Sequence, residues 1–146
     1  MSQDASEMAA MAGPAHGSFC WTEIASTDSA KCKEFYSNVF GWKFQDSDAT
    51  DGTFAYHEFS TGGDYPAGGL YQISPEVCGE AELPPPHLMT YIAVDNVDEN
   101  AKLAEELGGK IIKPPMDIPN TGRFAMIQDP TGAMFAIFTM QEGHHG

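Results

Sequence analysis

Trp21 and Glu23 bring an aromatic ring and a carboxylate to the same side of an expected strand. Residues 19–25 are expected to form a strand, and because successive side chains of a strand point to opposite faces, these two should share one face. Apolar rings beside a carboxylate disfavour its charged form, which is how proton-transferring groups are tuned. The pattern predicts a general acid or base at Glu23. The alternative interpretation is a structural carboxylate that orders a neighbouring turn.

The pattern of this opening stretch recurs later in the chain. An ungapped offset of about 68 residues places 21–44 over 89–112, which pairs Trp21 with Met89 and Glu23 with Tyr91. The repeated order of strand, cap, helix, glycine and strand indicates a duplicated fold. If both repeats line one site, that site holds an indole, a thioether, a carboxylate and a phenol.

Two further side chains are candidates for chemistry, each with an alternative interpretation. His57 lies in an aromatic-rich strand segment and is either a proton-transfer group or an outward-facing residue. Arg123 is the sole arginine and is either a clamp for a carboxylate or phosphate or an ordinary ion-pair partner. His144 and His145 near the chain end are interpreted as a solvated tail that chelates only adventitious metal.

The charge balance excludes several classes of partner. Seven Lys and Arg against 21 Asp and Glu give a formal net charge of −14, which argues against binding to nucleic acid or to an anionic membrane surface. Three cysteines, without C-x-x-C spacing, fit a reducing cytoplasm better than a disulfide framework. The N-terminus lacks the basic segment of a signal peptide.

The periodicities predict two βαβββ modules in an α+β fold. The expected modules are 16–73 and 88–140, joined by a proline-rich linker at 74–87 and flanked by a mobile tail at 1–15 and a second tail at 141–146. Within the second module, residues 114–122 are expected to form a loop because of three prolines. Residues 129–132 have the Asp, Pro and Gly positions of a type I turn.

Each module contains one expected helix. The first should be capped by Asp28 and end at Gly41; the second should be capped by Asp95 or Asn96. Helical spacing predicts these core-facing residues: Cys32, Phe35, Tyr36, Val39 and Phe40 in the first helix, and Val97, Ala101, Ala104 and Leu107 in the second.

Three short motifs in this duplicated frame resemble the vicinal oxygen chelate superfamily of glyoxalases, bleomycin-resistance proteins and extradiol dioxygenases. They are Phe35-Tyr36, Phe40-Gly41-Trp42 and the turn at 129–132. The opening, residues 16–23, is similar to a bacterial glyoxalase-like subgroup. The resemblance implies that each module forms half of a cup-shaped mixed sheet, that the halves enclose a small-molecule site, and that the chain forms a homodimer.

The resemblance also identifies where metal ligands would lie. These positions hold Trp21, Met89 and Ala136, and the remaining one falls within residues 67–71, which contain no carboxylate or imidazole. Hard and borderline cations need nitrogen or oxygen donors. We therefore expect neither the usual metal site nor a cofactor.

Three functional hypotheses follow. The first is a metal-free binder of a partly aromatic or apolar small molecule, with Glu23 orienting the ligand. Its expected ligand-binding residues are Trp21, Glu23, Tyr71, Met89, Tyr91, Arg123 and Ala136. The second is a lyase, isomerase or dioxygenase with a rearranged or absent metal that uses Glu23 or His57 for proton transfer. The third is a dimeric interaction module.

Overall fold

A computed structural model describes residues 14–46, 55–63, 65–75, 83–118 and 121–140. It divides into two compact units, which we call the first half (residues 21–89) and the second half (residues 90 onward, with the start of the chain). Most of the expected N-terminal tail, the C-terminal tail with His144 and His145, Cys78, and much of the expected linker lie outside the described residues. No helix in the described ranges is long and apolar enough to cross a membrane.

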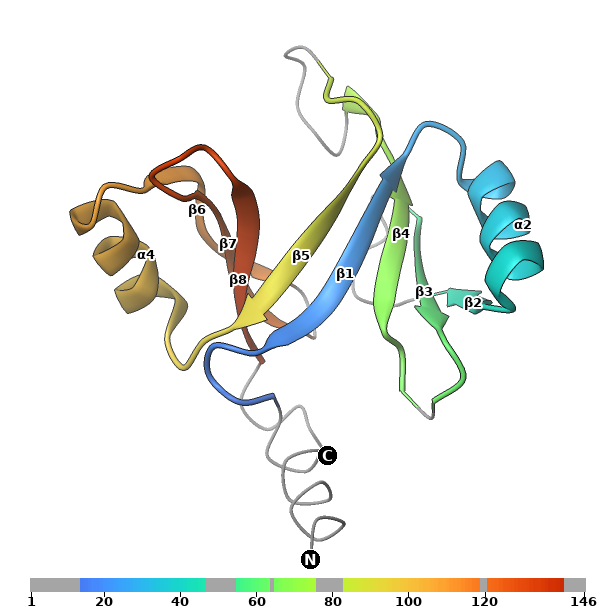
Figure 1. The fold of residues 1–146 in the computed structure, drawn as a ribbon, viewed down its shortest axis with the longest axis horizontal. Helices are drawn as coiled ribbons and strands as arrows, with labels where there is room; N and C mark the ends of the chain where they lie inside the picture. Colours follow the sequence, from blue (N-terminus) through green and yellow to red (C-terminus); the bar gives the residue numbers. More distant parts are fainter. Residues whose placement is uncertain (1–13, 47–54, 64, 76–82, 119–120, 141–146) are drawn as a thin grey trace, which may run out of the picture. The chain divides into compact units, whose positions relative to one another are not determined.

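The first half contains one helix and strands in the order β2-β3-β4-β1. Its elements are β1 (Phe19–Ser26), α2 (Ser29–Phe40), β2 (Lys43–Asp46), β3 (Tyr56–Ser60) and β4 (Gly68–Gln72). β1 runs parallel to β4, whereas the pairs β3–β4 and β2–β3 are antiparallel. Figure 1 shows α2 beside these strands.

The second half repeats this arrangement with strands in the order β5-β8-β7-β6. Its elements are β5 (His87–Ala93, whose residues up to Met89 belong to the first half), α4 (Val97–Glu106), β6 (Lys110–Ile118), β7 (Gly122–Gln128) and β8 (Met134–Met140). β5 and β8 are parallel, and β8–β7 and β7–β6 are antiparallel. The expected α+β fold with two βαβββ modules is therefore confirmed.

Local capping chemistry sets the helix ends. The Asp28 carboxylate accepts from the Lys31 N–H at 3.1 Å, and Gly41 adopts the left-handed conformation (φ 76°) that favours glycine. In α4 the cap is Asn96, whose side-chain oxygen accepts from the Glu99 N–H at 3.0 Å. Of the two expected cap residues, Asn96 is the one that fills the role.

The α4 helix packs tightly on its strands. Val97 and Ala101 are buried against Ala125, Ile127 and Ile137, and Ala104 packs at the edge of this cluster. The expectation that Leu107 faces inward is wrong: it is 70% exposed, because α4 ends at Glu106 and Leu107 caps it with non-helical dihedral angles.

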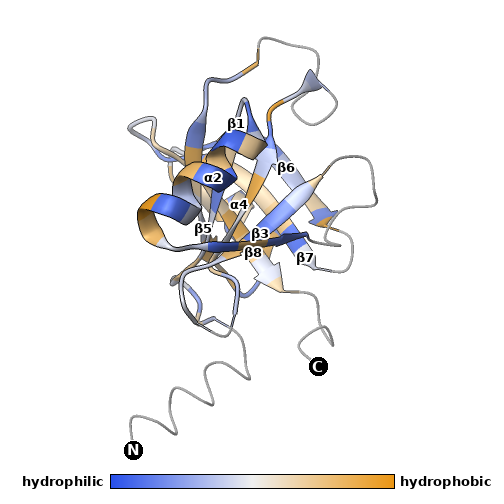
Figure 2. Ribbon diagram, turned by 90° about the vertical axis from the view of Figure 1, so that its right-hand side faces the viewer, coloured by the Kyte–Doolittle hydropathy of each residue, from blue (hydrophilic) through white to orange (hydrophobic). Residues whose placement is uncertain are grey.

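The α2 helix is covered less completely. None of its residues is buried; Cys32 and Tyr36 pack partly on the core of Ile24, Phe59 and Leu70. The other apolar residues of its stripe, namely Phe35, Val39 and Phe40, are each more than half exposed, contrary to the expected core-facing role. Figure 2 shows hydrophobic and hydrophilic residues alternating around this helix. The core beneath α2 contains only three buried residues among those described, so Cys32 and Tyr36 are enough to cover it. The other apolar residues of the helix remain at the surface.

The expected loop at residues 114–122 is in part a strand. β6 continues through Pro114 and Pro115 to Ile118, with register shifts on either side of Lys113. β6 lies at the end of its strand order, and a strand at that position can carry prolines because their missing N–H groups need not bond a neighbour.

Candidate functional site

A hydrogen-bonded chain of three side chains crosses one strand face of the first half. The Trp21 indole Nε1–H donates to the Tyr56 phenol oxygen at 2.9 Å. The Tyr56 hydroxyl in turn donates to Glu23 Oε2 at 2.7 Å. Since all three side chains are partly buried, these bonds fix the rings and the carboxylate relative to one another.

The strand register explains how residues on β1 and β3 meet although β4 lies between them. Gly69 on β4 is opposite Glu23 on one side and Glu58 on the other. A Cβ atom at Gly69 would overlap the phenol of Tyr56. The ring therefore lies directly over the glycine, and the missing side chain is what allows Tyr56 to reach Glu23.

Tyr56 was missed as a site residue in the sequence. It stands one residue before His57, and alternation alone does not say which of the two faces Glu23. The usable signal was Gly69, a glycine inside a strand, which often marks a place where another group approaches the backbone closely. Tyr71 is paired with Tyr56 across β3 and β4, so the phenols of both residues belong to the same strand face.

His57 lies on the opposite face of these strands. Its register partners are Leu70 and Asp46, and its Nδ1 lies 2.9 Å from Asp46 Oδ1. The imidazole is 14% exposed, while the Asp46 side chain is largely in solvent. The structure does not bring His57 together with Glu23.

In the second half, the equivalent strand face is aromatic. Tyr91 on β5 is paired with Ala136 on β8, and Met89 lies on the same face of β5 by alternation. The Tyr91 ring lies 6.2 Å from Phe124 and 6.5 Å from Phe138, between centroids. Phe124 and Phe138 were not among the expected site residues. Phe138 shares a face with Ala136 by alternation along β8, which was the available signal, whereas Phe124 joins that face only through its pairing with Phe138 across β7 and β8.

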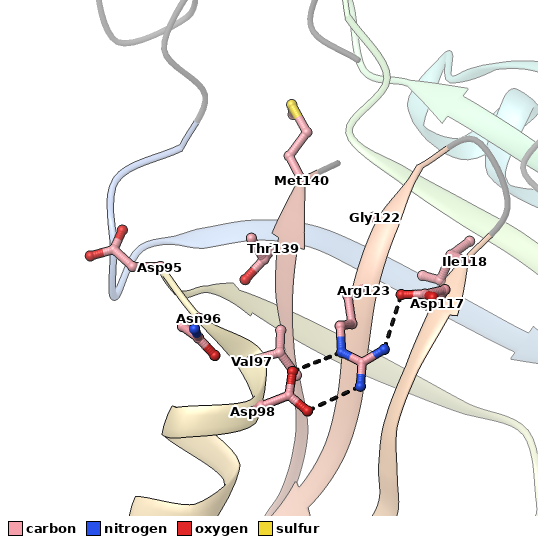
Figure 3. Close-up of a pocket in the computed structure, with 10 residues that line it drawn as sticks. All are labelled: Asp95, Asn96, Val97, Asp98, Asp117, Ile118, Gly122, Arg123, Thr139 and Met140. Carbon is pink, nitrogen blue, oxygen red and sulfur yellow. Dashed lines mark hydrogen bonds and ion pairs between the residues drawn. The ribbon is translucent and has the colours of Figure 1, made fainter. Parts of the chain in front are cut away.

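Arg123 lies on the other face of the second half, beside a cavity of about 490 Å³. Its guanidinium donates to both oxygens of Asp98, from Nε at 2.8 Å and from Nη2 at 3.0 Å, and to Asp117 from Nη1 at 3.0 Å. Figure 3 shows the guanidinium between the two carboxylates. This cavity is separate from the face that carries Tyr91 and Ala136, because Arg123 alternates with Phe124 along β7.

The charges of this cluster stabilise one another. Hydrogen bonds from Arg123 lower the pKa of Asp98, and the two aspartates raise the pKa of Arg123 above its already high ordinary value. Arg123 therefore forms an intramolecular ion pair. Of the two interpretations of its role, a clamp for a ligand or an ordinary ion-pair partner, the structure contains the ion pair.

The surroundings of Cys20 disfavour a role as a nucleophile. Burial raises the pKa of its thiol to about 11, and the Sγ atom lies 3.6 Å from the carbonyl oxygen of Tyr91. Because the thiolate is the reactive form, a thiol that stays protonated at neutral pH reacts slowly.

The chain matches known proteins over most of its length. A family model, the Glyoxalase/Bleomycin resistance protein/Dioxygenase superfamily, matches residues 18–137. The "Putative glyoxylase CFP32" of Mycobacterium tuberculosis is 35% identical over 118 residues, covering 81% of this chain and 44% of the relative. The "Anthracycline biosynthesis protein DnrV" of Streptomyces peucetius is 34% identical over 131 residues, covering 85% and 47%. The chain thus spans under half the length of these two relatives.

Solved structures share the fold at low sequence identity. The Mn(II)-bound glyoxalase from Novosphingobium aromaticivorans has a TM-score of 0.57 and 20% identity, covering 85% of this chain and 39% of that one. The methylmalonyl-CoA epimerase from Mycobacterium tuberculosis has a TM-score of 0.59 and 13% identity, covering 86% and 88%.

Proposed function

Because the chain belongs to the Glyoxalase/Bleomycin resistance protein/Dioxygenase superfamily, we propose that it binds a planar, partly aromatic small molecule on the strand face of Trp21, Tyr56 and Glu23. The carrying observation is the hydrogen-bonded chain from Trp21 Nε1 through the Tyr56 hydroxyl to Glu23 Oε2. It holds two aromatic rings and one carboxylate in a fixed arrangement, so little conformational entropy is lost when a ligand binds.

Each group has a distinct part in this proposal. The rings of Trp21, Tyr56 and Tyr71 supply flat apolar surface for a planar ligand. The Glu23 carboxylate, bonded to Tyr56, favours a ligand that donates a hydrogen bond to it, and the Glu58 carboxylate lies on the same strand face. Met89, Tyr91 and Ala136, which the sequence also predicts to bind the ligand, offer apolar surface on the corresponding face of β5 and β8. The name of one relative, an anthracycline biosynthesis protein, supports a planar polycyclic ligand.

The proposal does not include a metal ion at the positions that the superfamily resemblance identifies. Trp21 offers only an N–H donor there, and that donor already bonds Tyr56. Met89 and Ala136 are buried and carry no nitrogen or oxygen in their side chains. Among the described residues, no group of three or more His, Cys, Asp or Glu side chains is arranged to hold a metal. These donors do not fit a hard or borderline cation.

A melting-temperature screen tests the proposal. Planar phenols are added to wild-type protein, to Glu23→Gln and to the control Glu34→Gln, whose carboxylate is exposed on α2. A ligand at 100 times its dissociation constant should stabilise the wild type by about 2.7 kcal/mol. Glu23→Gln should lose most of this gain, and Glu34→Gln should keep it. A ligand that stabilises all three proteins equally would count against Glu23 as its anchor.

Metal analysis of chelator-treated, untagged protein tests the metal-free part separately. One tightly held divalent ion per chain that survives deletion of residues 144–146 would overturn it. Size-exclusion chromatography with light scattering measures the expected homodimer in the same sample.

The second candidate function is proton transfer at Glu23. The 2.7 Å contact between a phenol hydroxyl and a carboxylate favours it, because such a pair can pass a proton to or from a bound ligand. His57 has no part in this version, because it lies on the opposite strand face. Hydrogen–deuterium exchange at an acidic C–H of a bound ligand, lost in Glu23→Gln, is the expected result.

A further inference from the structure

The first half contains a second cavity, of about 220 Å³, on the face of its strands that α2 covers. Its walls include Thr22, Ile24, Tyr36, Trp42, Phe59 and Leu88. No charged side chain lines it, in a protein whose formal net charge is −14. Thr22 and Ile24 alternate with Trp21 and Glu23 along β1, so this cavity is on the side opposite the Trp21–Tyr56–Glu23 chain.

Three nearly parallel aromatic rings hold the cavity open. Trp42 stacks on Phe59 with centroids 4.5 Å apart and planes 1° apart, and on Tyr36 at 5.2 Å and 10°. Phe59 is 3% exposed and fits over Gly68, where a Cβ atom would overlap its ring. The wall is thus fixed by packing on one side rather than formed only when something binds.

The helix side of the cavity is accessible. No residue of α2 is buried, and Leu88 at the rim is 63% exposed. Apolar cavities of about 150 Å³ in protein interiors stay free of water and bind benzene. The present cavity, of about 220 Å³, is larger and is reachable from solvent, so a ligand that enters it removes apolar wall surface from water.

We propose that this cavity is a binding site for a neutral, apolar ring compound of one or two fused rings. The size of the cavity limits the ligand to that class. The absence of charged lining residues disfavours ions, because an ion would lose its hydration without gaining a counter-charge. Aromatic walls favour an aromatic ligand over an aliphatic one, since ring pairs gain energy beyond the area they bury. The site is independent of the proposed function.

The two tryptophans of the chain allow each site to be followed separately. Trp21→Phe leaves Trp42 as the sole indole, in the cavity wall. Bromobenzene, a neutral heavy-atom quencher, is titrated into this variant while Trp42 fluorescence is recorded. Saturable quenching is expected. Quenching that stays linear with concentration, as random collisions would give, would overturn the proposal. The absence of any quenching would overturn it too, and would indicate that a segment of the chain or a second copy of the protein fills the cavity.

Matched variants in the Trp21→Phe background localise the probe. Ala67→Phe fills the cavity, of which Ala67 is a wall residue, and should abolish the saturable phase. Leu88→Glu puts a carboxylate at the exposed rim and should weaken binding about tenfold without disturbing the fold. Leu107→Glu, at a 70% exposed position on the second half, is the control and should change nothing. Equal affinity in the Leu88 and Leu107 variants would refute the site.

Failure of this proposal and failure of the proposed function give different results. In the Trp42→Phe variant, Trp21 is the sole indole, so its fluorescence responds to ligands of the Trp21–Tyr56–Glu23 face. If the proposed function fails, this response is absent. If the cavity proposal fails, the saturable quenching of Trp42 in the Trp21→Phe variant is absent instead.

Discussion

The two halves of the molecule share one order of elements but pack their helices differently. In the second half, α4 buries Val97 and Ala101 in a continuous aliphatic core. In the first half, α2 buries no residue and rests on a stack of aromatic rings with a cavity beside it. The two copies of the repeat therefore share strand topology and N-terminal helix caps, but the packing of the helix on the strands differs between them. The less tightly packed copy also carries the hydrogen-bonded chain on its other face.

The largest expected effect is in the first half, at Gly69. Gly69→Ala places a methyl group where the Tyr56 ring lies, so Tyr56 must leave Glu23. We expect a loss of about 3 kcal/mol in the free energy of unfolding, from overpacking together with the broken hydrogen bonds. Urea denaturation measures it.

Two controls make the Gly69 result specific. Gly63→Ala, in open space, should cost little. Gly69→Ala combined with Tyr56→Ala should cost much less than the sum of the single changes, because the overlap is removed. Strict additivity would show that the ring does not lie over Gly69.

The same substitution in the two helices tests the packing difference directly. Val97→Ala in α4 should lower the free energy of unfolding by about 2 kcal/mol, since two buried methyl groups are lost and a cavity remains. Val39→Ala in α2, where the side chain is 54% exposed, should change it by less than about 0.5 kcal/mol. Similar losses at both positions would mean that α2 is as firmly packed as α4.

A smaller effect is expected when only the phenol oxygen of Tyr56 is removed. Tyr56→Phe keeps the ring but loses the bonds to Trp21 and Glu23, at a cost of about 1 kcal/mol. Tyr65→Phe, at a 76% exposed position, is the matched control. If the two variants have the same melting temperature, the hydrogen bonds from Trp21 through Tyr56 to Glu23 do not order this strand face.

The smallest effect concerns charge in the second half. Arg123 lowers the pKa of Asp98 in the folded protein, so Asp98 stabilises the fold above its unfolded pKa of about 4. That contribution is lost as the pH falls through the lower, folded pKa. The stability difference between wild type and Asp98→Asn should therefore be constant near neutral pH and shrink below about pH 4.

Salt provides the control for the charge prediction. The pair is partly exposed, so the difference between wild type and Asp98→Asn should decrease at high ionic strength. A difference that grows as the pH falls would contradict the direction of the pKa shift.

The frame of the molecule was predictable because its signals are local. The repeat, the caps at Asp28 and Asn96, and the turn at 129–132 depend on residues close in sequence, and the structure contains all of them. The course of β6 was not predictable. Prolines fit within a strand at a sheet edge or a bulge, and both edge position and register are properties of the whole topology.

The candidate site was predictable only in part. Alternation placed Trp21 and Glu23 on one face, but Tyr56 reaches them across β4, and that contact depends on register and on Gly69. His57 and Arg123 carry suggestive chemistry, yet register places both on the helix-covered faces. The roles of the expected ligand-binding residues remain predictions that the experiments above address.

The two prolines of β6 also bear on how copies of this protein meet. An outer strand with free N–H and C=O groups is a template on which another strand can add, and uncontrolled addition leads to polymers. Pro114 and Pro115 have no N–H to offer in the middle of β6. At the end of the other strand order, β2 is only four residues long and carries Lys43 and Asp46. Both outer strands thus discourage growth of fibrils by strand addition, so any dimer is expected to form through side-chain surfaces instead.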